Sequence, residues 1–599
     1  MNLYEVVNEL VLDTHRSLAA FLPELCLCAT IVLLLLVRVF RSGGRLDAFY
    51  LAWFGSGLAL CLAAPWSHLG AAAGPDSLAR IELFTGMLVY DGFTIFMRSI
   101  LIGFLFLLIL FTRLSGIPDP EDGPDMYTLF FGATLGMCLM ASANHLLLVF
   151  LGVEMSSVPS YVLAGLLRRK RLGSEAALKY SIYGAGAAGV MLYGISLVAG
   201  MLHTAHLPTL AIRLADELPG MAAGALMALT LAGLMIAVGL AFKLSAVPFH
   251  FWCPDVFEGA PAEVGAFLSV ASKAAALALL VRVAIGFGTI PPDDVPLGKR
   301  IVQAAAERID PGYGRGGLYA VGETTHRGAA GGGEPSPGRP SAPGAKAGER
   351  KSAAMQRLAA ARNFIAKLVA LLAAVTCTFG NLAAYAQTNM KRLLAYSTIA
   401  HAGYMMMPVS ALMVMAGHDA AAARGAVGGL AIYMGIYLFM NLGAFAIVAF
   451  LRNALGSEQI ADYAGLVRRS PVLVLCLSLI LFSLVGLPPL SGFIAKFAVF
   501  ASLVDGYRVS AAAEQPQAFL LALFGVGGVN TLLSVFYYVR VVKIMTMDEE
   551  PDHSRPLRWS ALSPQGLYVI LVTLPTALLI LDWNTLSRWA SAAARHLLM

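Results

Sequence analysis

The stretch that decides the fold is residues 221–248, MAAGALMALTLAGLMIAVGLAFKLSAVP. Its first twenty-two residues, Met221 to Phe242, carry no charge. A helix of this length can cross a bilayer. Lys243 follows, and an ammonium group inside hydrocarbon costs about 3 kcal/mol or more. Pro248 has no N–H to donate to the carbonyl of Leu244, so the helix is predicted to kink or open here. A buried charge beside a freed carbonyl is typical of a protein that moves an ion or a proton.

The same arrangement occurs again towards the C-terminus. Lys496 is the only charged residue in segment 471–504, and it follows residues 487–492, Leu-Pro-Pro-Leu-Ser-Gly. The two interrupted segments are five predicted spans apart, and broken helices in corresponding positions indicate internal repeats with ion sites near the middle of the membrane. Because five is odd, the second repeat must be inverted. We predict two inverted five-helix repeats, with broken helices near Pro248 and Pro488.

Composition places the chain in the all-α polytopic membrane class. Of 599 residues, 58% are hydrophobic and 13% are charged, which excludes an ordinary soluble domain. The length rule predicts about fourteen transmembrane helices. The first of these carries Pro23 and Glu24 after a non-basic start, so we expect it to be a retained span. The basic residues lie in short loops between apolar runs, so we expect no nucleic-acid partner.

The expected domain organisation follows from these runs. Residues 1–125 form N-terminal transmembrane helices, 126–287 the first repeat, 288–361 a disordered low-complexity loop, 362–545 the second repeat, and 546–599 a loop and the last helix. The loop is rich in Gly, Pro, Ala and Arg, with a short helix possible over 297–309. Short connections rich in Lys and Arg fall on one side, which predicts that both termini face outward. These connections contain Arg38, Arg41 and Arg45, then Arg168–Arg171, Lys391 and Arg392, Arg452, Arg468 and Arg469, and Arg540 and Lys543.

Four charges lie inside predicted spans and are the main candidates for chemistry. They are Glu154, Lys243, Lys273 and Lys496. A lysine paired with a carboxylate changes its proton affinity when the pair opens, which is what a pump requires. The alternative is that these charges only pair helices or reach the interface from the span ends. Lys179 is also a candidate for the proton path, but it lies four residues after Glu175 and could equally form a surface ion pair.

Histidines form a second group of candidates, because histidine can relay protons near neutral pH. His401 lies inside a predicted span, whereas His250 and His145 lie at span ends. Each could instead serve only as a hydrogen-bonding group between helices. Glu82 and Asp91 flank the start of the third span and are expected to be interfacial.

Cofactor-binding signals are missing from the sequence. The seven cysteines form no pair of CxxC motifs, so we expect no zinc or iron–sulfur site. No Walker A or dinucleotide-binding motif occurs, so we expect no binding of ATP or NADH by this chain.

Several segments closely resemble one family. Residues 254–261, Pro-Asp-Val-Phe-Glu-Gly-Ala-Pro, and 269–273, Ser-Val-Ala-Ser-Lys, are similar to the signature of the antiporter-like subunits of respiratory complex I, and specifically to subunit N of NADH-quinone oxidoreductases. Residues 387–397, 441–445 and the lysine at 496 agree with that pattern. The resemblance covers nearly the whole chain except 288–361, and this insertion puts the lateral contacts of the outer face in doubt.

The resemblance implies a role for each matched residue. Glu154 and Lys243 would form a switchable ion pair, and Lys273 would pass protons towards the centre of the subunit. His401 would lie near a central polar axis, and Lys496 would release protons towards the outer side. It also implies an inner-membrane location, partners among the other membrane subunits of complex I and the lipid bilayer, and no cofactor in this chain. NADH, FMN, iron–sulfur clusters and quinone would be held by other subunits.

Two other functions remain open at this point. A stand-alone cation/proton antiporter subunit would share the Lys–Glu spans and broken helices. A structural subunit that bridges its neighbours without pumping would tolerate neutralisation of all four buried charges. The electron donor and quinone of the complex, and a choice of Na⁺ over H⁺, are not encoded in these residues.

Overall fold

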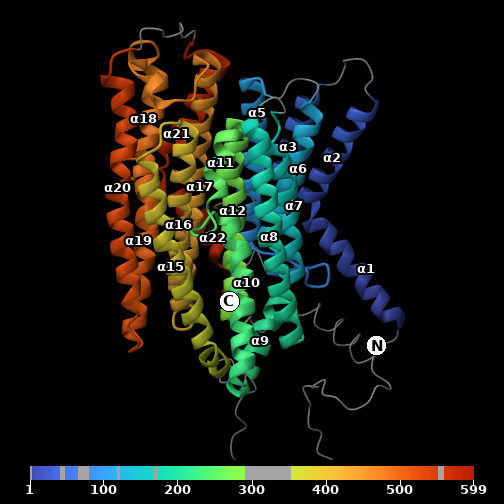
Figure 1. The fold of residues 1–599 in the computed structure, drawn as a ribbon. Helices are drawn as coiled ribbons and strands as arrows, with labels where there is room; N and C mark the ends of the chain where they lie inside the picture. The colour runs from blue at the N-terminus through green and yellow to red at the C-terminus, as the bar shows by residue number, and fades with distance from the viewer. Residues whose placement is uncertain are drawn as a thin grey trace, which may run out of the picture.

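The molecule is a bundle of long, roughly parallel helices (Figure 1). The computed structural model describes residues 3–40, 47–64, 80–117, 122–167, 171–290, 352–550 and 559–598. The helices of the N-terminal half are α1 (Leu3–Ala20), α2 (Leu22–Phe40), α3 (Ala48–Ala63), α5 (Gly92–Ser115), α6 (Gly123–Ser142), α7 (Leu146–Ala164), α8 (Arg171–Leu202), α9 (Leu207–Glu217), α10 (Ala223–Leu244), α11 (Trp252–Gly259) and α12 (Ala262–Gly288). Those of the C-terminal half are α15 (Ala359–Ala384), α16 (Met390–Met415), α17 (Ala420–Leu455), α18 (Pro471–Val485), α19 (Ser491–Ala512), α20 (Phe519–Met547), α21 (Pro564–Leu578) and α22 (Trp583–Ala594).

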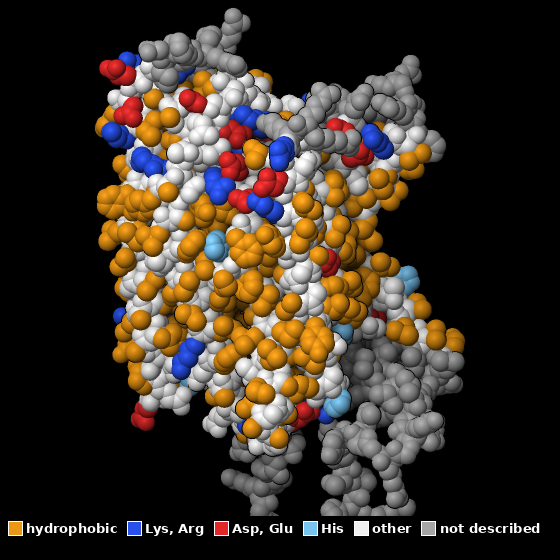
Figure 2. All heavy atoms as spheres, in the orientation of Figure 1, with side chains coloured by type: hydrophobic (Ala, Val, Ile, Leu, Met, Phe, Trp, Pro, Cys, Tyr) orange, Lys and Arg blue, Asp and Glu red, His pale blue; other side chains and the backbone are white. Residues whose placement is uncertain are grey.

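The predicted class, an all-α polytopic membrane protein, is confirmed. Ten helices of the described part are long and apolar enough to cross a membrane, or eleven if the bent pair α21 and α22 counts as one span. Helices α3 and α18 are apolar but shorter. Apolar side chains cover the middle of the surface, whereas charged side chains gather at the upper end (Figure 2). The number fourteen and the inverted repeats stay predictions.

Both predicted helix breaks are present. Helix α10 ends at Leu244 and α11 begins at Trp252, while α18 ends at Val485 and α19 begins at Ser491. The residue that follows each first helix has a left-handed backbone: Ser245 has φ +56° and Gly486 has φ +87°. This conformation is a common helix stop. A Cβ at Gly486 would come within 2.9 Å of Lys496 Cδ, so glycine also leaves room for that side chain.

The N-terminal region differs from the prediction. A separate helix, α1, precedes the first predicted span, and the chain bends at Phe21 before α2 starts. Pro23 lies in the first turn of α2, where its missing N–H leaves no helical bond unmade. A hairpin of β1 (Ile81–Leu83) and β2 (Leu88–Tyr90), with Glu82 paired to Val89, precedes α5, and the amphipathic α9 follows α8. Periodicity did not indicate these short elements.

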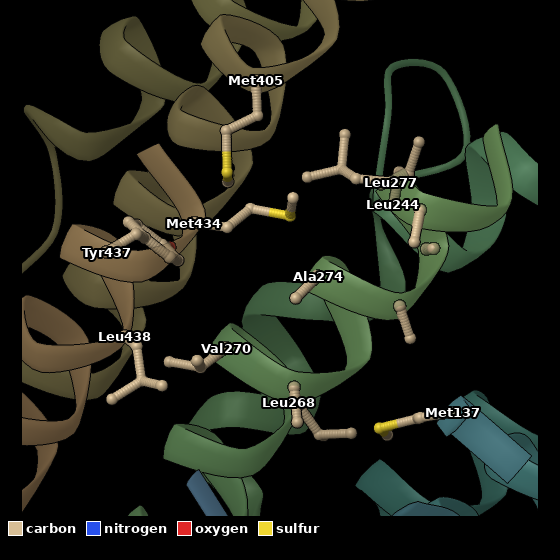
Figure 3. Close-up of a cluster of buried hydrophobic side chains, with 14 of the residues drawn as sticks. Met137, Leu244, Leu268, Val270, Ala274, Leu277, Met405, Met434, Tyr437 and Leu438 are labelled. Atoms are coloured by element: carbon tan, nitrogen blue, oxygen red, sulfur yellow. The ribbon is translucent and has the colours of Figure 1, made fainter. Parts of the chain in front are cut away.

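Helices α12, α16 and α17 form the centre of the bundle. Helix α16 packs against α15, α17, α19 and α12, and α17 packs against α12 and α19. Side chains from α12 meet those from α16 and α17 in an apolar contact that includes Leu277, Met405 and Met434 (Figure 3). Methionine fills irregular contacts readily, which suits it to this contact between α12 and the helices of the C-terminal half. Of the predicted loop 288–361, residues 291–351, including the possible helix 297–309, lie outside the described residues.

Candidate functional site

Lys243 lies in the last turn of α10 and is buried. Its Nζ donates to Ser157 Oγ on α7 at 2.9 Å. Glu154 lies one turn before Ser157 on the same helix, yet no ion pair within 4.0 Å joins it to Lys243 in the described structure. Glu154 Oε1 is buried and accepts no hydrogen bond from the described residues. The predicted partners are therefore neighbours on adjoining helices with the pair open.

Lys273, on α12, binds the first helix break. Its buried Nζ donates to the carbonyl oxygen of Leu244, the last residue of α10, at 2.8 Å. The carbonyls of a last helical turn have no intrahelical partner, and they carry partial negative charge. The C-terminal end of α10 is thus flanked by two lysines, Lys243 from its own last turn and Lys273 from α12.

Lys496, on α19, binds the second break in the same way. Its buried Nζ donates to the carbonyl oxygen of Val485, the last residue of α18, at 2.9 Å. The ammonium also lies 4.4 Å from the centroid of the Tyr404 ring, a cation–π distance. Lys273 and Lys496 therefore each satisfy the final carbonyl of a broken helix.

His401 lies between these lysines, on α16, and is surrounded by tyrosine hydroxyls. Its Nδ1 lies 2.7 Å from Tyr433 Oη and its Nε2 lies 3.4 Å from Tyr538 Oη. Tyr538 also contacts Ser397 Oγ. His401 and Tyr404 are three residues apart on one helix face, so the histidine is one turn from the ring under Lys496.

A hydroxyl cluster joins α12 to the histidine. Ser269, one turn before Lys273, lies 3.1 Å from Thr398 Oγ1 and donates to Asn441 Oδ1 at 3.1 Å. Thr398 is one turn before His401 on α16. Polar groups thus recur from Lys273 through Ser269 and Thr398 to His401. The helices that carry this row, α12 and α16, also contribute buried apolar side chains such as Leu277 and Met405 (Figure 3), and a low-polarity interior strengthens charge interactions.

Lys179 occupies a different environment, at the charged end of α8. Its Nζ contacts Glu175 at 2.7 Å and Asp255 at 2.8 Å, and its side chain is 35% exposed. Asp255 also pairs with Arg392, which in turn contacts Glu258 at 2.6 Å. The structure thus places Lys179 in a surface network of ion pairs, apart from the buried lysines.

The other histidines have local contacts. His145 Nδ1 accepts from the amide of Leu147 at 3.2 Å and so caps the start of α7. The ring of His250, between α10 and α11, packs against Phe379 with centroids 4.3 Å apart. Neither contact involves Glu154, Lys243, Lys273 or Lys496.

Asp91 corrects one prediction, because it is buried and not interfacial. Its carboxylate accepts from Arg282 Nη1 and Nη2 at 2.6 and 2.7 Å and caps α5 through Thr94 N at 2.8 Å. A second buried pair joins Arg98 Nε to Glu24 Oε1 at 2.7 Å. These pairs tie α5 to α12 and to α2, and neither pairing was predicted. Arginines inside apolar runs were the available signal.

Glu82 lies in β1, outside the spans, within a polar cluster. His206 Nε2 lies 3.3 Å from Glu82 Oε1, and Asn144 Nδ2 donates to the same oxygen at 3.1 Å. Burial pushes the pKa of Glu82 upward, but the hydrogen bond and charge of His206, with help from Arg80 and Asn144, outweigh it and hold the pKa below its ordinary 4.5.

Within the described segments, no three His, Cys, Asp or Glu side chains gather as a metal site would require. The site consists of lysines, hydroxyls, a histidine and carboxylates, which is a set of proton donors and acceptors.

Comparison with known proteins identifies the family. Residues 143–290 and 346–514 match the family model described as NADH:quinone oxidoreductase/Mrp antiporter, TM. A curated relative, NADH-quinone oxidoreductase subunit N of Anaeromyxobacter sp. (strain Fw109-5), is 35% identical over 98% of each chain. The chain belongs to the family of NADH-quinone oxidoreductase subunit N. The predicted resemblance is therefore confirmed.

Solved structures agree with this membership of the subunit N family. A chain of respiratory complex I from Thermus thermophilus with bound aureothin has a TM-score of 0.61 at 25% identity, with 93% of this chain and 97% of that chain covered. The archaeal membrane-bound sulfane sulfur reductase shares the fold, with a TM-score of 0.69 at 17% identity over 97% and 99% of the two chains. This subunit N homologue is an antiporter-like, multi-pass membrane subunit.

Proposed function

We propose that this chain translocates protons as a membrane subunit of an NADH-quinone oxidoreductase, driven by NADH-to-quinone electron transfer in other subunits. The observation that carries the proposal is the set of three buried lysines, each bonded to a neutral acceptor. Lys243 donates to a serine hydroxyl, and Lys273 and Lys496 donate to the last carbonyls of broken helices. Burying a charge costs free energy, so a charge retained inside a membrane protein indicates a function. None of these three lysines is neutralised by a close carboxylate of the described residues.

The first step is opening and closing of the Glu154–Lys243 pair. Ser157 and Glu154 lie on one face of α7, so a short movement of the Lys243 side chain exchanges the hydroxyl for the carboxylate. With the pair closed, the charged lysine is favoured; with the pair open, as here, the lysine more readily gives up its proton. Charge changes at this pair act on Lys273 through a low-dielectric interior.

The second step is transfer along the polar row. Lys273 passes a proton through Ser269 and Thr398 towards His401, and Lys496 beyond Tyr404 releases it on the outer side. Lys179 and Asp255 serve at the opposite, charged end as a surface group from which protons reach α10. The break between α10 and α11 and the break between α18 and α19 belong to two inverted repeats, residues 126–287 and 362–545.

The family and the charge distribution support the following setting. The charged end of the bundle faces the cytoplasm, both termini face outward, and the subunit lies in the inner membrane between other membrane subunits of the complex. NADH, FMN, iron–sulfur clusters and quinone are bound by those other subunits.

The test is NADH-driven acidification of inverted membrane vesicles that carry Lys243→Ala, with NADH oxidation measured in the same vesicles. With the complex assembled, we expect both rates to fall, because proton and electron transfer are coupled. Lys367→Ala is the matched control, since Lys367 is an exposed lysine on α15. Normal rates of both in Lys243→Ala would contradict the proposal and favour a structural subunit. Na⁺-dependent transport without any NADH signal in the wild type would favour a cation antiporter.

A further inference from the structure

Glu263 is a buried acid that the mechanism above does not use. It is the second residue of α12 and is fully buried. It lies at the charged end of the bundle, where Lys391 Nζ donates to the Ala260 carbonyl at 2.8 Å and contacts Glu458 at 3.0 Å. Lys273 lies ten residues further along the same helix, about 15 Å by helix rise.

The carboxylate of Glu263 is poorly satisfied by the described residues. Both of its oxygens are buried and accept no hydrogen bond from them. Arg452 Nη2, at the end of α17, lies 3.8 Å from Oε1, which is too long for a hydrogen bond. By contrast, Asp91 accepts three hydrogen bonds shorter than 3 Å.

This contrast argues against a purely structural role. Buried acids that only hold helices together have donors or a close cation, as Glu24 has Arg98 Nε at 2.7 Å, because an unsatisfied buried carboxylate costs stability. Glu154, a member of the proposed switch, also has a buried oxygen without a hydrogen-bond donor. Arg452 is itself 13% exposed and engages Asn453, so it can either approach Glu263 or remain with Asn453.

We propose that Glu263 is a proton-uptake carboxylate at the charged end of α12, loading the row that begins at Ser269 and Lys273, with Arg452 as its switching partner. The inference rests on the proposed function and names a second point of uptake beside the surface group of Lys179 and Asp255. A proton adds to a Glu263 oxygen when Arg452 is withdrawn and leaves when Arg452 returns. Only a proton moves, and no electron transfer or covalent bond to another group is involved.

Glu263→Gln tests this proposal because glutamine has the shape of glutamate but cannot gain or lose a proton. A structural Glu263 would tolerate glutamine well, since a neutral amide costs less to bury than a carboxylate. We expect protons translocated per NADH oxidised to fall at least twofold in inverted vesicles with normal amounts of assembled complex. Glu263→Asp, which still titrates, should retain most of the wild-type ratio. Asp505→Asn, at an exposed acid on α19, should match wild type.

Lys243→Ala is measured in parallel to separate the two proposals. A wild-type ratio in Glu263→Gln together with loss of pumping in Lys243→Ala would overturn the role of Glu263 and leave the proposed function intact. Wild-type behaviour of both variants would overturn both. If Glu263→Gln lowers assembly, Arg452→Gln takes its place: a ratio at least twofold lower supports the inference, and an unchanged ratio overturns it.

Discussion

Lys273 donates a 2.8 Å hydrogen bond to the carbonyl oxygen of Leu244, so a lysine of one helix closes the broken end of another. Lys496 has the same relationship to Val485 at the second break. In both places the cation lies at the negative end of a helix dipole, which offsets part of the cost of burying it. Each lysine that is proposed to carry protons therefore also stabilises the end of a broken helix.

Lys273→Met should therefore affect both stability and transport. The carbonyl of Leu244 loses a charge-assisted hydrogen bond, which costs about 1.5–3 kcal/mol. We expect a lower thermal midpoint for the complex and loss of NADH-driven acidification. Lys367→Met, at an exposed position on α15, should change neither; equal behaviour of the two variants would show that the bond to Leu244 is unimportant.

Ser157→Ala should alter the position of Lys243. Without the hydroxyl, the ammonium has no acceptor at 2.9 Å and is expected to move to Glu154, closing the pair. Acidification per NADH oxidised should fall while the complex still assembles. Ser160→Ala is the control, because Ser160 Oγ donates to its own helix, at the carbonyl of Ser156. A normal ratio in Ser157→Ala would mean that this serine does not control the pair.

Asp91→Asn should strongly destabilise the subunit. Asparagine can still cap α5, but it leaves Arg282 buried without its carboxylate, which costs about 3–5 kcal/mol. The measurement is the thermal midpoint and the amount of folded subunit. Asp47→Asn is a close match, since Asp47 caps α3 and pairs with Arg113 at 3.0 Å in an exposed position, where the loss should be about 0–1 kcal/mol. A similar loss of stability in Asp91→Asn and Asp47→Asn would contradict the expectation that burial makes the Asp91–Arg282 pair more important.

Glu82 should make stability depend on pH. Because its folded-state pKa lies below 4.5, its stabilising contribution is fully present above 4.5 and is lost as the pH falls through the folded-state value. Wild type should exceed Glu82→Gln in thermal midpoint at neutral pH, and the difference should shrink as the pH falls below 4.5. A difference that stays constant or grows under acid would refute the assignment to Glu82.

Much of the site was accessible from the sequence because buried charges are rare. Lys243, Lys273 and Lys496 stood out as charges within apolar runs, and Pro248 and Pro488 marked the two breaks. Their acceptors did not stand out, since a serine hydroxyl or a main-chain carbonyl has no distinguishing pattern. Asp91 was placed at the interface because its partner, Arg282, is far away in sequence and meets it only after α12 packs on α5.

The sequence by itself determined the membrane class, the helix breaks and the burial of Lys243, Lys273 and Lys496, because these depend on the length of apolar runs and on the chemistry of proline and lysine. Only the tertiary structure decided which groups meet: Lys243 with Ser157, Lys273 with Leu244, His401 with Tyr433, and Glu263 with Arg452 at 3.8 Å. The reason is physical. Transfer into hydrocarbon acts on each residue separately, whereas a hydrogen bond depends on the packing of helices that lie far apart in the chain.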